Sequence, residues 1–389
     1  MRRRVLLSLV TAMTTVAVAQ PMPWTVGVIV SRTGPAAASG ALPAHAVERF
    51  ADTLGRSGVF GTPIRIDVRD DAGDPARAAA LAAELADAGA AAVVCCTTAA
   101  ATVSVGAVLE TAGVPLLALT DVDPAATTWT FGLAPSDRTR LTAIAVDAAD
   151  EGKVSLALMT LATPFGDAAV DAFERALSDA GRSGAGEARY PADAPVLTPE
   201  ALWIATRQPG AVVVWGLPLD LTRAIDALRR RGYEGLVYAR PEAFPVAQLA
   251  RARAAGAPLR GDDAWTGVRG PFAPAVLAGR LPVEHPNHAA VAAFVGRTLA
   301  GNPAAAAAAD RAVLALVDDA LVWLLAAMAQ VAALGLDDGV ATRRQALRDA
   351  LISLPPLALA AGTYDATDGD RRAARWQGLV VAELGPPTP

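Results

Sequence analysis

The chain has 389 residues, of which 53% are hydrophobic, and its formal net charge at pH 7 is -5. This length exceeds one ordinary hydrophobic core, so we expect two α/β lobes. Lys153 is the only lysine and no basic stripe is present, which argues against a nucleic-acid partner. Alanine is the most frequent apolar residue, and alanine-rich helices packed on a sheet explain the high apolar content without a membrane span.

The N-terminus predicts an export signal. Residues 2–4 are three arginines, residues 5–16 form an apolar region, and residues 17–19 give a small-x-small cleavage site. A short membrane anchor is the alternative, but the apolar run is short for a span. No cysteine lies near the cleavage point, so we expect no lipoprotein anchor. We therefore expect residues 1–19 to be a signal peptide cleaved near Ala19, and the mature protein to be soluble and periplasmic.

The first part of the mature chain alternates strands and helices. We expect a strand over Trp24–Val30, a loop over Ser31–Gly40, a helix over Pro43–Leu54, a strand over Ile64–Val68, and a helix from Asp74-Pro75 to Gly89. Asp74 suits an N-cap and Pro75 suits the first helical position. Asp70, Asp71 and Asp74 lack the further oxygen ligands of a calcium loop. We therefore expect a solvated loop and one helix cap there.

Residues 90–124 contain two short apolar runs that end in polar residues. Ala91–Cys96 stops at Thr97 and Thr98, and Val114–Leu119 stops at Thr120 and Asp121. Neither run alternates, which is typical of parallel strands covered on both faces. A helix over Val103–Thr111, ended by Gly113 in a left-handed conformation, joins them. In open α/β sheets, ligands bind outside the carboxyl ends of the strands, so these two turns predict a binding site.

The only cysteines, Cys95 and Cys96, are neighbours at the end of the first of these strands. Buried cysteines act as small apolar side chains, which is the interpretation we favour. A strained disulfide between neighbours and a reactive thiol are the alternatives.

The alternation of strands and helices resumes after Asp137 and predicts a second doubly wound sheet. We expect strands over Val154–Met159, Ala211–Trp215 and Leu236–Ala239, and helices over Ala168–Ala180 and Leu221–Arg231. Three helices follow, over Ala289–Leu299, Ala309–Leu334 and about Thr342–Ile352, and then a short β-rich tail over Gly362–Leu384. Two sheets joined near Asp137 predict a site between two lobes.

Eight short pieces occur in a characteristic order along this chain. They are TGPAAASG at Thr33, RDDAGDPARA at Arg69, ETAGVPLLALTDVDPAAT at Glu110, APSD at Ala134, PFGDAAVDAFERAL at Pro164, RPEAF at Arg240, LPVEHPN at Leu281 and GTYDATDGDR at Gly362. In this order they resemble the type I periplasmic solute-binding proteins, in the branched-chain amino-acid and amide branch that serves ABC importers. The pieces are distributed along nearly the whole mature chain, from Thr33 to Arg371.

This resemblance implies two Rossmann-like lobes joined by a three-crossing hinge. The first lobe would contain residues 20–137 and about 271–354, and the second residues 138–270 and about 355–389. The ligand residues that it implies are Ser39, Thr97, Thr98, Ala99, Thr120, Asp121 and Val122 in the first lobe, and Phe165 and Glu242 in the second. Hydroxyls and backbone N–H groups of the first lobe would hold a ligand carboxylate. Glu242 would pair with a ligand ammonium, and the Phe165 ring would cover the ligand.

Three of these positions depart from the pattern of the family. Ala99 lacks a hydroxyl, Val122 cannot donate a hydrogen bond, and Asp121 adds a negative charge near the expected ligand carboxylate. Such a like-charge contact costs on the order of several kcal/mol. The candidates are therefore an amino acid bound with Asp121 turned away, or a neutral or cationic amide or amine.

Each of these residues also has a purely structural interpretation. The three threonines could cap helices, Asp121 could be a cap or turn residue, Phe165 could pack within its lobe, and Glu242 could be a surface residue. Trp129 and Trp215 are left out of the site, because large aromatic residues are more often part of a core.

The sequence contains no G-x-S-x-G elbow, P-loop or G-x-G-x-x-G motif. The histidines are His45, His285 and His288, and a zinc site needs at least three protein ligands. We therefore expect no metal site, no cofactor and no enzymatic activity.

The function that these observations predict is that of a monomeric periplasmic substrate-binding protein. It would capture an amino acid or related small polar solute by hinge closure and deliver it to an inner-membrane ABC permease. A periplasmic ligand sensor of a signalling system is the alternative within the same fold. An exported hydrolase that uses Asp121 and Glu242 as paired carboxylates is the alternative from another class.

Overall fold

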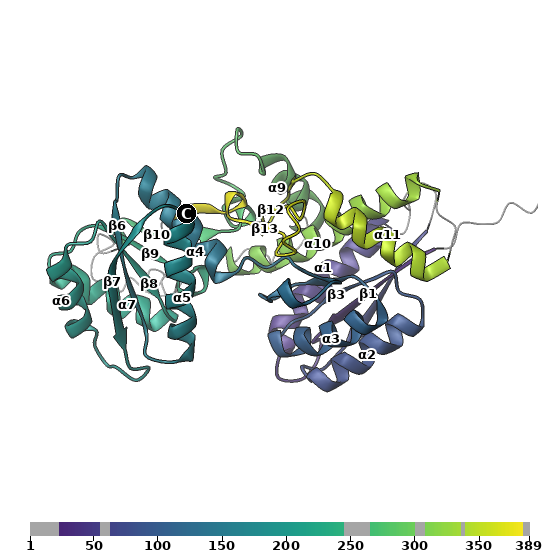
Figure 1. The fold of residues 1–389 in the computed structure, drawn as a ribbon, viewed down its shortest axis with the longest axis horizontal. Coiled ribbons are helices and arrows are strands. Elements are labelled where there is room, and N and C mark those ends of the chain that lie inside the picture. The colour runs from purple at the N-terminus through teal and green to yellow at the C-terminus, as the bar shows by residue number, and fades with distance from the viewer. Residues whose placement is uncertain (1–22, 55–62, 245–264, 300–307, 336–338, 384–389) are drawn as a thin grey trace, which may run out of the picture.

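The computed structural model describes residues 23–54, 63–244, 265–299, 308–335 and 339–383, so the predicted signal peptide lies outside it. Figure 1 shows two lobes, each built on its own sheet. The strand orders are β2-β1-β3-β4-β5 in the first sheet and β14-β10-β9-β8-β6-β7 in the second. The predicted α/β fold with two doubly wound sheets is thus confirmed.

The strands of the first sheet are parallel, and all except the edge strand β2 are mostly buried. They are β1 (Trp24–Val30), β2 (Ile64–Asp70), β3 (Ala92–Cys95), β4 (Leu116–Ala118) and β5 (Thr130–Gly132). In the register, Val28 lies between Val68 and Val94. Because β1 and β3 are covered on both faces, their continuous apolar sequence is what this position requires.

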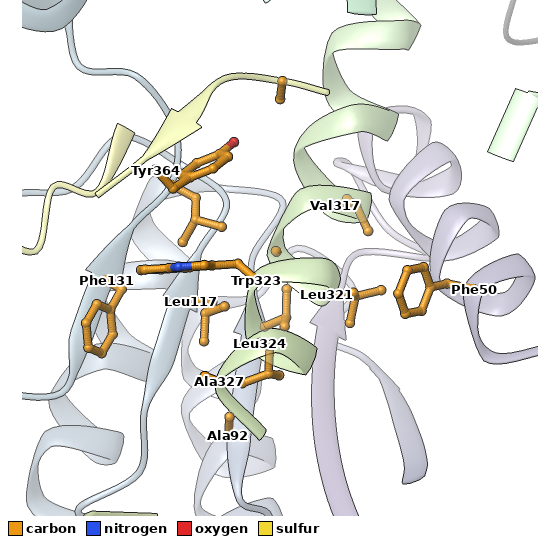
Figure 2. Packing of buried hydrophobic residues seen from close by; sticks show 14 of the residues in the cluster. Phe50, Ala92, Leu117, Phe131, Val317, Leu321, Trp323, Leu324, Ala327 and Tyr364 are labelled. Carbon is orange, nitrogen blue, oxygen red and sulfur yellow. The ribbon is translucent and has the colours of Figure 1, made fainter. Parts of the chain in front are cut away.

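Helices cover both faces of the first sheet. They are α1 (Ala37–Leu54), α2 (Pro75–Asp87), α3 (Ala99–Ala112), α10 (Ala308–Ala333) and α11 (Gly339–Ser353). Leu85 of α2 and Leu109 of α3 pack with Ile29 on one face. On the other face, α10 lies against the sheet through Leu321, Trp323 and other residues shown in Figure 2.

Local capping explains where these helices begin and end. Asp74 caps α2 as predicted, accepting hydrogen bonds from the N–H groups of Ala76 and Arg77. Gly113 ends α3 in the left-handed conformation, at φ 62°, also as predicted. The predicted starts of α1 and α3 are wrong by several residues, because α1 begins at Ala37 and α3 begins directly after its cap, Thr98.

Asp70 and Asp71 hold the turn after β1 instead of forming a solvated loop. Asp70 Oδ1 accepts hydrogen bonds from the N–H groups of Arg32 and Thr33. Asp71 is buried, and its Oδ1 accepts a 2.6 Å hydrogen bond from Ser31 Oγ. The expectation of solvation is therefore wrong for Asp71, since its carboxylate fixes one strand end to the next.

The second sheet contains six strands, and its last strand is antiparallel to its neighbour. The strands are β6 (Ser155–Leu161), β7 (Ser183–Tyr190), β8 (Ala211–Trp215), β9 (Leu236–Ala239), β10 (Val268–Phe272) and β14 (Val380–Glu383). The helices on this sheet are α4 (Asp137–Asp150), α5 (Pro164–Asp179), α6 (Thr198–Arg207) and α7 (Pro218–Arg230). α4, β7, α6 and β10 were not predicted from the sequence, and β7 is an edge strand without an apolar run.

The chain then returns to the first lobe. After the 3₁₀ turn η4 (Pro274–Leu277) it forms α9 (His288–Phe294), which continues into a π-helical turn, η5 (Val295–Leu299), where one longer helix was predicted. The later helices α10 and α11 follow as expected. Most of the alanine run 304–309 lies outside the described residues.

The tail forms a small antiparallel sheet near the junction of the two lobes (Figure 1). Its strands are β11 (Leu357–Ala358), β12 (Thr363–Tyr364) and β13 (Ala374–Arg375). Tyr364 stacks on Trp323 with 6.1 Å between ring centroids, so this segment shares the core of the first lobe. The boundary expected near residue 355 does not match this packing. We propose that the last hinge crossing lies where the turn η7 (Trp376–Gly378) leads into β14.

Helix α10 is long and apolar enough, by length and composition, to cross a membrane. However, Leu314, Leu321 and Leu324 are buried in the core of the first lobe. Asp319 on the same helix accepts hydrogen bonds from the N–H groups of Ala360 and Ala361, at 2.8 and 2.6 Å. We therefore interpret α10 as a core helix of its lobe.

Cys95 and Cys96 are both buried beside α2 and α3, as small apolar side chains would be. The structure also pairs their sulfur atoms as a disulfide between neighbours, which was one of the alternatives left open by the sequence.

Candidate functional site between the lobes

Three threonine hydroxyls lie where β3 and β4 end, and each has a partner. Thr97 Oγ1 accepts a hydrogen bond from the N–H of Ser31 at 2.9 Å. Thr98 Oγ1 caps α3 by accepting a hydrogen bond from the N–H of Ala101 at 3.3 Å. The interpretation of Thr98 as a helix cap is therefore correct. Thr120 Oγ1 lies 2.8 Å from the hydroxyl of Thr102. The structure thus brings the predicted hydroxyls together at one edge of the first sheet.

Replacing Thr98 with alanine should destabilise the protein by about 1 kcal/mol, because α3 loses a capping oxygen. Urea unfolding measures this change. Thr98→Ser keeps the oxygen and should stay close to the wild type. Equal losses in both variants would show that the methyl group, and not the cap, stabilises this turn.

Three other predicted residues form no side-chain hydrogen bond within the described part of the chain. Ala99 is exposed at the first position of α3, and Val122 is half-buried. Ser39 was expected in a loop but lies exposed in the first turn of α1. Gly40 lets this turn approach the strand end, because a Cβ atom there would lie 2.0 Å from the carbonyl oxygen of Ser31.

The second lobe contributes a cluster of charged and aromatic residues at the ends of its own strands. Glu242, in the 3₁₀ turn η2 (Pro241–Ala243) after β9, forms ion pairs with Arg140 at 3.0 Å and Arg240 at 3.1 Å. The Arg240 guanidinium lies 5.2 Å from the ring centroid of Phe165 and 5.8 Å from that of Trp215. We call these five residues the second-lobe cluster.

The charge of Glu242 is already compensated within this cluster. Burial alone would raise the pKa of Glu242, but Arg140 and Arg240 outweigh it and hold this pKa below its usual value. The carboxylate is therefore ionised at neutral pH, with a guanidinium on either side. A role of Glu242 as the partner of a ligand ammonium stays a prediction, and the ammonium would have to compete with two arginines.

Asp121 lies where the end of β4 faces α4 of the other lobe. Its charged neighbours are Asp137 and Arg140 on α4, and Arg372 from the tail. Burial raises the pKa of Asp121 to about 6, and the charge of Asp137 acts in the same direction. The two arginines and a hydrogen bond from the backbone N–H of Asp137 act against it. The side chain is open to solvent and yet has protein on several sides, as expected for a carboxylate between two lobes.

The neighbours of Asp121 have partners of their own. Arg140 pairs with Glu242, and also with Asp137 at 3.7 Å. Arg372 pairs with Asp123 at 2.5 Å. The Asp137 carboxylate accepts a 3.0 Å hydrogen bond from Trp215 Nε1.

Several residues of this site were not predicted from the sequence. Arg240 stands two positions before Glu242 in the same RPEAF piece, which is a usable signal. Arg140 and Asp137 lie three apart on α4, so they share a helix face, but α4 itself was not predicted. Trp215 was assigned to a core, and it is buried, yet its indole N–H reaches the site.

A pocket of about 300 Å³ lies on a different side of α4 and contains none of the predicted site residues. Arg138, Thr142 and Val146 line it, which places it on the face of α4 opposite Asp137 and Arg140. Its other walls come from the tail, including Arg372 and Trp376. The pocket therefore lies behind the inter-lobe site.

Among the residues that the structure describes, no group of three His, Cys, Asp or Glu side chains could hold a metal ion. His285 Nδ1 accepts a hydrogen bond from the N–H of Asn287, and His288 Nδ1 lies 3.2 Å from the carbonyl oxygen of Leu281. Both histidines thus have structural contacts in the first lobe.

Two parallel-dominated sheets, with polar residues gathered at the strand ends between them, define a two-lobed binding protein of the type I periplasmic fold. A family model described as periplasmic binding protein matches residues 23–384. The chain belongs to this periplasmic binding protein family, as the order of its sequence pieces implied. No curated protein matches it by sequence.

Solved structures agree on the fold. A putative branched-chain amino acid ABC transporter protein from Rhodospirillum rubrum has 21% identity and a TM-score of 0.70, covering 93% of this chain and 100% of its own. An extracellular ligand-binding receptor from Rhodopseudomonas palustris has 21% identity and a TM-score of 0.67, over 94% and 97% of the two chains. LivJ of Streptococcus pneumoniae, solved with isoleucine, has 15% identity and a TM-score of 0.59, over 94% and 100%. At these identities the likeness supports the fold and not the ligand.

Proposed function

We propose that this protein is the periplasmic substrate-binding component of an ABC importer, which captures an amino acid or related small polar solute between its lobes and delivers it to an inner-membrane permease. The observation that carries the proposal is the meeting of polar side chains from the ends of β3, β4 and β9 between two sheets of a periplasmic binding protein. A ligand that contacts both lobes stabilises the closed arrangement, which is what a permease can recognise.

A catalytic role is disfavoured by the same geometry. Paired carboxylates that act as acid and base need one member protonated near neutral pH and within reach of the substrate. Asp121 could supply the protonated member, because its pKa is raised to about 6. Glu242, which would be the ionised member, is held by Arg140 and Arg240 and is therefore not free to take a proton from the substrate. We therefore propose binding without turnover. Unchanged probe after prolonged incubation is the expected result, and conversion of a probe would contradict it.

Thermal unfolding tests the binding function. The mature protein is refolded to remove bound solute and then screened with neutral, cationic and anionic amino acids, amides, polyamines and carboxylic acids. A solute present at about 100 times its dissociation constant should add roughly 2.7 kcal/mol of stability and raise the midpoint clearly. A panel that leaves the midpoint unchanged throughout would contradict the proposal.

A further inference from the structure

The ion pairs among the charged residues of the candidate site indicate which kind of solute the site selects. We propose that Asp121 is the specificity-determining residue, and that it pairs with a positively charged nitrogen of the solute while Glu242 does not. This inference rests on the proposed binding function and adds the chemical class of the ligand. It also reverses the orientation that the family resemblance implies, in which the ligand ammonium pairs with Glu242.

The first argument is the distribution of partners among the carboxylates near the site. Glu242 has two arginines, and Asp123 has Arg372. Asp137 has the indole N–H of Trp215 together with Arg140. Asp121 forms no ion pair with any residue in the described part of the chain, and its partner there is the backbone N–H of Asp137. Asp121 is exposed in the ligand-free protein, where water solvates its carboxylate. Closure of the lobes on a solute would remove this water, and an enclosed carboxylate without a cation is costly, so a cationic ligand nitrogen would supply the missing partner.

The second argument is that the nearby arginines cannot easily turn to Asp121. Arg140 already bridges Glu242 and Asp137, and its side chain is only 17% exposed. Arg372 lies 2.5 Å from Asp123 and is also fixed through the bridge between its backbone and Gly132. Moving the Arg140 guanidinium would leave Asp137 without a cation, and moving that of Arg372 would leave Asp123 without one. The carboxylate of Asp121 is therefore free to form an ion pair with a bound solute.

The third argument concerns the opposite wall. The second-lobe cluster places two guanidiniums beside the single carboxylate of Glu242. The two guanidiniums already neutralise Glu242, so a further cation would not be favoured beside it. Their N–H groups favour an oxygen acceptor of the ligand. The Phe165 ring, half-buried beside Arg240, offers an apolar surface next to that position. A solute with a cationic nitrogen toward Asp121 and its remaining polar atoms toward Arg140 and Arg240 thus matches both walls.

Isothermal titration calorimetry of the refolded mature protein tests the inference. The probes are agmatine, putrescine and L-arginine as cations, L-leucine as a neutral zwitterion, and succinate and benzoate as anions. We expect a cationic probe to bind most tightly. Asp121→Asn keeps the size of the side chain but removes its charge, and should weaken that binding roughly 100-fold. Glu242→Gln should weaken it less than about tenfold.

Asp226→Asn is the matched control, because it removes a carboxylate whose partner, Arg230, is not a charged neighbour of Asp121. Its affinity for the cationic probe should stay within about threefold of the wild type. Circular dichroism and the thermal midpoint of the ligand-free protein confirm that each variant is folded. A loss of affinity in Asp121→Asn alone, with the fold intact, supports the assignment.

Three results would overturn it, and they separate the inference from the proposed function. If a probe binds, and Glu242→Gln abolishes this binding while Asp121→Asn does not, the ammonium lies at Glu242 and only the inference fails. If an anionic probe binds best and Asp121→Asn tightens it, the inference fails in the same way. If no probe of any charge binds to the wild type, the inference and the proposed function fail together.

Discussion

Replacing Trp323 with alanine is expected to lower the free energy of unfolding by about 4 kcal/mol, the range found for large buried aromatic residues. Trp323 is 1% exposed on α10. Its ring meets Phe131 of β5 edge-on at 5.7 Å and stacks with Tyr364 of β12 at 6.1 Å (Figure 2). One side chain therefore joins the sheet, the core helix and the tail, and its loss leaves a cavity among three elements. Urea unfolding followed by circular dichroism measures the change.

Trp203→Ala is the control for this experiment. Trp203 lies half-buried on α6, with the guanidinium of Arg207 3.4 Å from its ring centroid. Its removal should cost about 1 kcal/mol, the value of a partly exposed cation–π contact. Equal losses in the two variants would show that Trp323 is not the packing centre that the structure indicates.

The affinity for a cationic probe is expected to fall when the pH drops below about 6. The pKa of Asp121 is raised to about 6 in the ligand-free protein, chiefly by burial. A cation binds the ionised carboxylate, so protonation competes with it. Affinity should then fall about tenfold for each pH unit between about 6 and the lower pKa that Asp121 has in the complex. The loss should reach roughly 30-fold at pH 4.5, as measured by calorimetry with agmatine.

Asp121→Asn should remove most of this pH dependence. In the ligand-free protein the sign is opposite, because a carboxyl group whose pKa is raised on folding stabilises the protein at low pH and loses that contribution as the pH rises from about 4 to about 6. The variant should thus be at least as stable as the wild type at pH 7. An affinity that rises toward low pH would contradict the assignment of a cation to Asp121.

The parts of the fold that could be predicted are those that follow from local chemistry. β1 and β8 lie at their predicted bounds because continuous β-branched residues suit a strand buried on both faces. Asp74 and Gly113 lie at helix ends because the side chain of one and the positive φ of the other satisfy backbone groups there. α4 and β7 were missed because their positions depend on partners far away in the sequence, and their own patterns are mixed.

The same distinction holds for the site. The position of Thr97, Thr120 and Asp121 at one edge of the sheet could be predicted, because residues that follow buried parallel strands lie at the same edge. Their role in ligand binding stays a prediction. The pairing of Glu242 with Arg140 could not be predicted, because it joins residues about one hundred positions apart across α4 and the turn after β9. The local sequence shows which side chains follow each strand. Which of the carboxylates there lacks an arginine partner depends on ion pairs between residues that are distant in the sequence.

Small-angle X-ray scattering of the mature protein, with and without a saturating concentration of the probe that binds most tightly, tests the central claim most directly. If the solute binds between the lobes and holds them together, the radius of gyration should fall on saturation and return when the solute is removed. Asp121→Asn at the same probe concentration should keep the larger radius. A radius that does not change while calorimetry shows full occupancy would contradict closure around the ligand.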